Sequence, residues 1–267
     1  MAHAVIPKGQ SGLDWWMPLR MLVRFPLLIL HILLGIPLTI VTFNRLGRSI
    51  RVAQQSLDEA MLRWWSRTLC RLFGLQLSVT GKLAPAPDLV VANHVSWLDI
   101  PLLHALGHMS FVAKSEIRKW PLVGWLATLA ETVYHKRGCS DSLQGTAEEI
   151  TGRLREGVRV AIFPEGRVFP GDTVHRFHAR LFRAAMDAPC PVQPVCIRYT
   201  RNGAINKDIS FRFGESFLSN FFRLLASQSC HAEVSILPTL SPVASERRVL
   251  ADAAQQQVLN CYGNKHG

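Results

Sequence analysis

The segment VVANHVSWLDIPLL, residues 90–103, places a histidine and an aspartate five residues apart. His94 follows a short apolar run that predicts a buried strand, and Asp99 begins a run that predicts a helix. Residues five apart on one continuous helix point about 140° away from each other, so these side chains can meet only across a turn. An imidazole held by a carboxylate is a general base, because one ring nitrogen stays free to take a proton.

The same residues also have a purely structural explanation. Ser96 and Asp99 have the spacing of a capping box, in which Ser96 accepts a backbone N–H bond at the start of a helix. Position favours chemistry, because loops at the carboxyl ends of strands in open α/β sheets are where ligands bind. The motif alone does not distinguish a catalytic pair from a capping box, so the other motifs of the chain are needed to choose between them.

A second polar cluster follows another predicted strand, in VAIFPEGRVFPGD, residues 160–172. Phe163, Pro164, Glu165 and Gly166 end that strand, where proline stops the ladder and glycine allows a ligand to approach the backbone. An ordinary turn is the alternative. Arg167 comes next, and we expect it either to face an anionic ligand or to pair with a nearby carboxylate.

Two more cations stand at predicted strand ends. Lys114 ends SFVAK, and Arg137 belongs to the cluster TVYHKRG. A charge run of this kind is usually a solvated edge, so either residue becomes a candidate ligand for a phosphate or carboxylate only together with the other clusters.

From residue 74 to residue 267 the chain alternates short β-branched runs with helical patterns, which predicts an α/β domain with a central, mostly parallel or mixed sheet flanked by helices. The predicted strands are 75–81, 88–93, 110–114, 132–137, 159–164, 191–199, 208–214 and 232–237. The predicted helices are 99–107, 120–130, 140–156, 178–188 and 245–262.

Residues 1–73 predict a membrane-anchoring segment. Residues 25–43 contain no charged side chain, and as a helix they would measure about 28 Å against a hydrocarbon core of roughly 30 Å. Arginines flank both ends, which favours a helical hairpin that enters and leaves on the cytoplasmic side. The next predicted helix, residues 56–74, carries arginines and two tryptophans; it suits an anionic headgroup region or packs on the globular domain.

Composition narrows the partners. The formal charge of +11 is compatible with nucleic acid, anionic lipid or acidic substrates, but 48% hydrophobic residues and the apolar N-terminal run favour a membrane. No nucleic-acid-binding motif is present, so we expect no nucleic-acid partner. The six cysteines show neither a C-x-x-C pair nor zinc spacing, and we expect no disulfide framework and no metal.

The order of these motifs resembles the PlsC-type glycerophospholipid acyltransferases, which include 1-acylglycerol-3-phosphate and lyso-ornithine lipid acyltransferases. The resemblance covers roughly residues 75–200. It rests on N-H-x-x-x-x-D (Asn93, His94, Asp99), Lys114 within residues 111–127, Arg137, F-P-E-G (163–166) and a V-x-P-V strand (192–195).

The resemblance implies that His94 is the general base and that Asp99 orients it. It also implies that the F-P-E-G segment and Arg137 serve the acceptor's glycerol and headgroup. The family commonly continues F-P-E-G-T-R-S, whereas Arg167 and Val168 stand here, and Arg180 occupies a position that often holds glycine or serine. These departures bear on the acceptor more than on the reaction.

We therefore expect an O-acyltransferase at the inner membrane, with its active site facing the cytoplasm. Its partners would be a lysolipid acceptor, most simply 1-acylglycerol-3-phosphate or else lyso-ornithine lipid, and a thioester of acyl carrier protein or coenzyme A as co-substrate, with no bound cofactor. No G-x-S-x-G elbow exists, which favours direct transfer over an acyl-enzyme. A membrane-surface lipid hydrolase that uses the same His-Asp pair is the alternative from another class.

Overall fold

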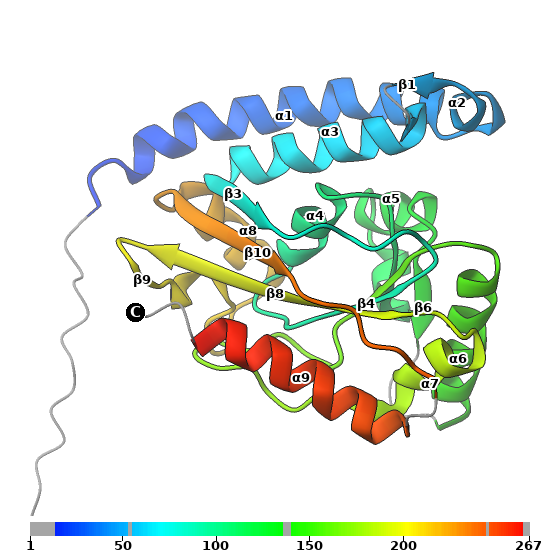
Figure 1. Ribbon diagram of the computed structural model, residues 1–267. Coiled ribbons are helices and arrows are strands. Elements are labelled where there is room, and N and C mark those ends of the chain that lie inside the picture. Colours follow the sequence, from blue (N-terminus) through cyan, green and yellow to red (C-terminus); the bar gives the residue numbers. More distant parts are fainter. Residues whose placement is uncertain (1–13, 53–54, 136–139, 244–245, 264–267) are drawn as a thin grey trace, which may run out of the picture.

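The computed structural model describes residues 14–52, 55–135, 140–243 and 246–263, without the side chains of 140–143. Its centre is an eight-stranded sheet in the order β3-β10-β8-β4-β7-β5-β6, with β9 paired to β8 (Figure 1). The strands are β3 (Leu75–Thr80), β4 (Leu89–Ala92), β5 (Ser110–Lys114), β6 (Val133–His135), β7 (Val160–Ile162), β8 (Val192–Arg201), β9 (Ala204–Ile205) and β10 (Cys230–Ile236).

The sheet is mixed, as the sequence predicts. Strand β4 runs parallel to β7 and β8, β5 runs parallel to β7 and β6, and β8 pairs antiparallel with β10. Every residue of β4 is buried, because helices cover both faces of the sheet at this point. The parallel strands β4, β5 and β7 bring their carboxyl ends to one edge, and this edge carries the polar clusters.

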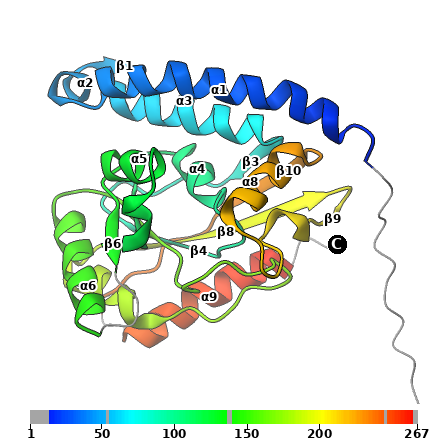
Figure 2. The ribbon, with the colours of Figure 1, turned by 180° about the vertical axis from the view of Figure 1, so that it is seen from behind.

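Helices form the outer layers around this sheet. Two long helices, α1 and α3, lie side by side over one side of the α/β body, and α9 lies on the opposite side in both views (Figures 1 and 2). The helices are α1 (Met17–Thr42), α2 (Arg45–Ser49), α3 (Leu57–Leu72), α4 (Asp99–His104), α5 (Val123–Leu129), α6 (Ser140–Arg155), α7 (Arg183–Asp187), α8 (Phe217–Ala226) and α9 (Arg247–Gly263).

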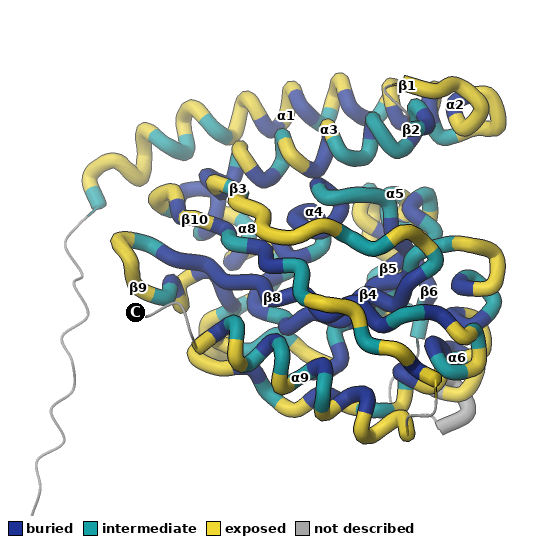
Figure 3. Tube along the Cα trace, in the orientation of Figure 1, coloured by how far each residue is buried: buried dark blue, intermediate teal, exposed yellow. Residues whose placement is uncertain are grey.

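The α1–α3 hairpin packs through small and aromatic residues. The buried residues of α1 recur every three or four positions from Leu28 to Thr42, so one face of this part of the helix meets the protein. Gly35 allows the closest approach, since a Cβ there would lie 1.7 Å from a ring carbon of Trp65. The helix continues through Pro26 and Pro37, and its length and composition suffice to cross a membrane. Its opposite face is exposed (Figure 3).

Two predicted elements differ in the structure. The helix expected over 178–188 is divided into a 3₁₀ turn, η2 (Ala179–Phe182), and α7. The strand expected over 208–214 is absent from this described segment, where a 3₁₀ turn, η3 (Lys207–Ile209), leads into a loop. Asn206 starts that turn by accepting a bond from the Asp208 amide. Of the alternating apolar residues, Ile209 is buried and Phe211 is half-buried, but Phe213 projects fully into solvent.

Candidate active site

His94 and Asp99 meet across the turn between β4 and α4. Nδ1 of His94 lies 2.8 Å from Oδ2 of Asp99. The same carboxylate oxygen accepts the backbone amides of Val95 at 2.8 Å and Ser96 at 2.9 Å. Asp99 is fully buried, whereas the His94 side chain is 15% exposed, so the pair presents the imidazole and hides the carboxylate.

The two explanations of the motif turn out to be compatible. Asp99 accepts the Ser96 amide as a capping-box acid would, but the N-cap of α4 is Leu98 and not Ser96 as expected. Ser96 Oγ accepts the Leu98 amide at 3.4 Å, within the turn before the helix. Asp99 also holds the imidazole, so one carboxylate both shapes the turn and orients the histidine. Ser96 is fully buried, which removes its hydroxyl from any attack on a substrate.

Tyr199 is a further member of this group that the sequence did not reveal. Its hydroxyl donates to Asp99 Oδ1 at 2.6 Å from β8, the strand beside β4. Burial, with Asp99 adding to it, raises the pKa of Tyr199 well above its ordinary value, so the phenol stays a donor. A tyrosine on a wholly buried strand gives no signal in the sequence that it faces a carboxylate 100 residues away.

Asn93 fixes the start of the turn. Its side chain donates to the carbonyl of Ile197 at 2.9 Å and accepts the Ile197 amide at 2.8 Å. The buried side chain thus continues the pairing of β4 with β8 by one step past Ala92, which pairs with Val195. This explains why an asparagine precedes the histidine at the end of an apolar strand.

Glu165 fixes the same turn from the β7 side. One carboxylate oxygen accepts the His94 amide and the other accepts the His175 amide, both at 2.7 Å. Burial raises the pKa of Glu165 to about 7, and the two amide bonds only partly oppose this shift. The two amide bonds engage both oxygens of Glu165 and tie the F-P-E-G segment directly to the loop that carries His94.

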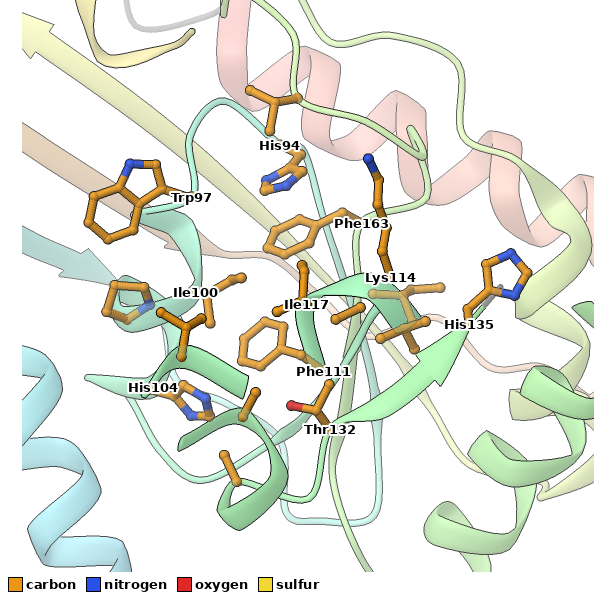
Figure 4. A pocket seen from close by; sticks show the side chains of 18 of the residues that line it. His94, Trp97, Ile100, His104, Phe111, Lys114, Ile117, Thr132, His135 and Phe163 are labelled. Carbon is orange, nitrogen blue, oxygen red and sulfur yellow. The ribbon is translucent and has the colours of Figure 1, made fainter. Parts of the chain in front are cut away.

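Phe163 supports the imidazole from below. The two rings stack with their centroids 3.9 Å apart and an interplanar angle of 13°. In Figure 4, the His94 ring lies over Phe163, with Trp97 on one side and Lys114 on the other. Because Asp99 occupies Nδ1, Nε2 is the ring nitrogen that can exchange a proton with a ligand.

His94 lines a cavity of about 1570 Å³. Its walls are mostly apolar and come from both parts of the chain, including Leu28 and Trp65 of the hairpin and Trp97 and Phe111 of the α/β domain. This volume and lining suit a long hydrocarbon chain next to a general base.

The predicted ligands of the headgroup lie at different depths. Lys114 and Arg167 are both exposed and line the cavity, whereas Pro164 is buried and its carbonyl accepts the His178 amide. The Arg167 guanidinium lies 4.5 Å from the ring centre of Phe169. Gly166 is exposed with a φ of 75°, a conformation that glycine adopts without strain. Arg137 lies outside the residues that the structure describes.

Within the described part of the chain, no group of three or more His, Cys, Asp or Glu side chains is arranged to hold a metal ion. The His94–Asp99 pair has the geometry for acid–base chemistry, and His94 lines the mostly apolar cavity.

Comparisons with known proteins agree with this geometry. Residues 76–198 match the family described as Acyltransferase. A lyso-ornithine lipid O-acyltransferase from Pseudomonas aeruginosa is 38% identical over 202 residues, which cover 76% of this chain and 78% of that protein. A 1-acyl-sn-glycerol-3-phosphate acyltransferase from Neisseria gonorrhoeae is 39% identical over 120 residues, 43% of this chain and 47% of that protein.

The fold has a solved counterpart. The crystal structure of the 1-acyl-sn-glycerophosphate acyltransferase PlsC from Thermotoga maritima superposes with a TM-score of 0.70 at 21% identity, covering 92% of this chain and 94% of that one. At that identity the likeness bears on the fold, which includes the N-terminal hairpin. Taken with the extended similarity to the Pseudomonas protein, these findings show that the chain belongs to the lysolipid O-acyltransferase family of PlsC type.

Proposed function

We propose that this protein transfers an acyl group from a thioester to the free hydroxyl of lyso-ornithine lipid. The observation that carries the reaction is the His94–Asp99 pair, with its 2.8 Å contact and its exposed imidazole edge on an apolar cavity. The acceptor follows from the similarity to the Pseudomonas relative, which extends well beyond the motifs.

The chemistry needs only groups that the site provides. Nε2 of His94 takes the proton of the acceptor hydroxyl while that oxygen attacks the thioester carbonyl carbon. The resulting tetrahedral intermediate collapses, the carbon–sulfur bond breaks, and the departing thiolate takes the proton back from the imidazolium. Asp99 holds the tautomer and stabilises the transient imidazolium. Direct transfer fits the buried position of Ser96.

Lys114 and Arg167 are the groups that we assign to the acceptor headgroup. Both are exposed cations on the cavity that holds His94. A guanidinium binds a carboxylate through two parallel bonds, which suits the carboxylate of an ornithine headgroup. The same cations suit a phosphate, so 1-acylglycerol-3-phosphate is the second candidate acceptor.

We further propose that the α1–α3 hairpin holds the protein on the cytoplasmic face of the inner membrane. The exposed side chains of α1 are apolar, with Leu22, Leu33 and Val41 each more than 60% exposed. The other face of α1 packs on the protein from Leu28 to Thr42, and Arg20 and Arg24 bond to carbonyls at the end of α8. We therefore expect the helix to lie in the membrane surface and not to cross the bilayer. A lysolipid could then reach the cavity without leaving the membrane.

Mass spectrometry of products tests the proposal. The purified protein in lipid vesicles would receive lyso-ornithine lipid or 1-acylglycerol-3-phosphate, each with acyl carrier protein or coenzyme A thioester. Diacylated ornithine lipid is the expected main product. Preferred formation of phosphatidic acid would show that 1-acylglycerol-3-phosphate is the acceptor. Release of fatty acid without an acceptor would show that the protein is a hydrolase and not an acyltransferase.

A further inference from the structure

Four arginines on one side of the cavity have no role in the acyl transfer described above. Arg176 and Arg180 come from the segment that leads into and through η2, and Arg247 and Arg248 from the start of α9. All four are exposed, and all four line the cavity that contains His94. We call these four residues the arginine face.

Within the part of the chain that the structure describes, no acidic side chain forms an ion pair with the arginine face. Among the described residues, the arginines that form ion pairs are others, such as Arg159 with Asp88 and Arg223 with Glu215. The first turn of α9 contains no acidic residue. Arginines there oppose the positive end of the helix dipole, so their placement costs stability unless an anion approaches. Asp252 and Glu116 are the two carboxylates among the residues that line the cavity.

The location of the arginine face limits what can reach it. α9 lies on the opposite side of the α/β body from the α1–α3 hairpin, in both views (Figures 1 and 2). If the hairpin rests on the membrane, α9, which carries Arg247 and Arg248, lies on the side of the protein away from the bilayer. The cavity therefore joins a membrane side, where a lysolipid enters, to a basic side that soluble molecules can approach.

We propose that the arginine face is the docking surface for a small acidic acyl carrier protein, the thioester donor of the reaction. This inference rests on the proposed function. Its cations come from two separate segments and are all exposed, which matches a protein surface better than a single phosphate. Two exposed valines adjoin it in the sequence, Val243 at 72% and Val249 at 58%, and provide the apolar contact that a protein interface needs.

Docking there would place the donor correctly for transfer. The carrier remains outside on the arginine face, and its flexible arm extends through the basic mouth so that the thioester carbonyl reaches Nε2 of His94. The acyl chain enters the apolar cavity, whose walls include Leu28 and Trp65 of the hairpin. Arg180 is central to this assignment because it is exposed within η2 and lines the cavity that contains His94.

Charge reversal tests the docking surface. The variant Arg247→Glu/Arg248→Glu places two acids in the first turn of α9, where they favour the helix, so loss of folding does not explain a loss of activity. We expect its KM for acyl carrier protein thioester to rise about 10- to 100-fold with a small change in kcat. The KM for the coenzyme A thioester should change less than about threefold. Added NaCl should raise the wild-type KM for the carrier protein and remove the difference.

The matched control is Lys82→Glu/Lys207→Glu, which makes the same change in charge at two exposed positions outside the cavity. The control should retain the wild-type KM for both donors. An equal rise in KM for both donors would indicate that the arginines bind nucleotide or pantetheine phosphates, and it would overturn the proposal. So would wild-type activity restricted to coenzyme A thioesters, or an unchanged KM in the variant. A wild type that is inactive with every donor would instead refute the proposed function.

Discussion

Tyr199 and Asp99 form a buried hydrogen bond of 2.6 Å that joins β8 to the start of α4. The Asp99 carboxylate is divided between two tasks: Oδ1 receives the phenol, and Oδ2 receives the His94 ring and two backbone amides. Tyr199 does not line the cavity, so it positions the carboxylate and acts on the reaction only through it. A carboxylate fixed from both oxygens holds the imidazole at one angle.

Tyr199→Phe should lower kcat by about 10-fold, the equivalent of one charge-assisted hydrogen bond of ~1.5 kcal/mol, with little effect on KM. Loss of the donor leaves more negative charge on Asp99 beside the imidazole. The acidic limb of the rate–pH profile should therefore move to higher pH. Tyr262→Phe is the matched control, because that hydroxyl is also buried but donates to the Gly171 carbonyl at 2.6 Å. Equal profiles for the two variants would make Tyr199 a packing residue only.

His94→Ala should reduce turnover by about 10² to 10⁴-fold. The protein should stay folded, because Asn93, Glu165 and Asp99 hold the backbone of this turn independently of the imidazole. Asp99→Asn should also be slow but folded. Its amide oxygen can accept the Val95 and Ser96 amides, and its NH₂ can donate to Tyr199 after the hydroxyl turns. Circular dichroism and product formation measure the two properties separately. Near-normal turnover of His94→Ala would leave only the capping role for this motif.

The sequence predicted the α/β class because local patterns carry it: short buried runs, helical periodicity and turn residues all act within a few positions. The His94–Asp99 pair could be foreseen for the same reason, since only one turn separates the two residues. The strand expected over 208–214 was wrong because alternation alone does not say whether a partner strand is available, and Phe213 has none to pack against.

Long-range partners are what the sequence did not provide. The sequence carried no signal that the two oxygens of Glu165 accept the amides of His94 and His175. The role of Tyr199 depends on β8 lying next to β4, a neighbour relation set by sheet order. Glu165 lies 71 positions from His94, and Tyr199 lies 100 positions from Asp99. No local sequence pattern encodes which strands become neighbours in the sheet.

The buried Glu165 makes a prediction about pH. Its folded pKa is about 7 against an ordinary value of 4.5, so between these pH values the folded state holds a proton that the unfolded state has released. The contribution of Glu165 to the free energy of unfolding should therefore fall as the pH rises through this window, by an amount on the order of 3 kcal/mol. Glu165→Gln should lack this dependence. Urea unfolding of both proteins at pH 5 and pH 8 measures it, and parallel changes in the two would contradict it.

The hairpin leads to a prediction about membrane binding. Deleting residues 1–73 would remove more than an anchor, because Arg20 and Arg24 donate to the carbonyls at the end of α8, including Ala226 at 2.8 Å and Ser227 at 2.7 Å. Leu33→Glu/Ile40→Glu is the sharper change, since both side chains are exposed.

We expect this variant to fold normally and to float poorly with anionic vesicles, because two charges replace apolar contact with the membrane. The matched control is the same substitution at the equally exposed Val249 and Leu218, outside α1. If 1 M NaCl alone released the wild type from vesicles, insertion would be excluded and surface electrostatics would account for binding.

Arg167 is the residue at which this chain departs from the common family motif, and its surroundings favour a role in acceptor binding. Its guanidinium is exposed over Phe169, and both oxygens of the neighbouring Glu165 are engaged by backbone amides. Arg167→Thr should therefore raise the acceptor KM, with a loss of about 10- to 150-fold in kcat/KM and little change for the donor. Arg167→Lys keeps the charge without the planar fork. If bidentate contact matters, its kcat/KM for the acceptor should lie between those of the wild type and Arg167→Thr. Kinetics with phosphate-bearing and phosphate-free lysolipids measure the effect, and an unchanged KM for both would leave Lys114 as the described cation at the headgroup.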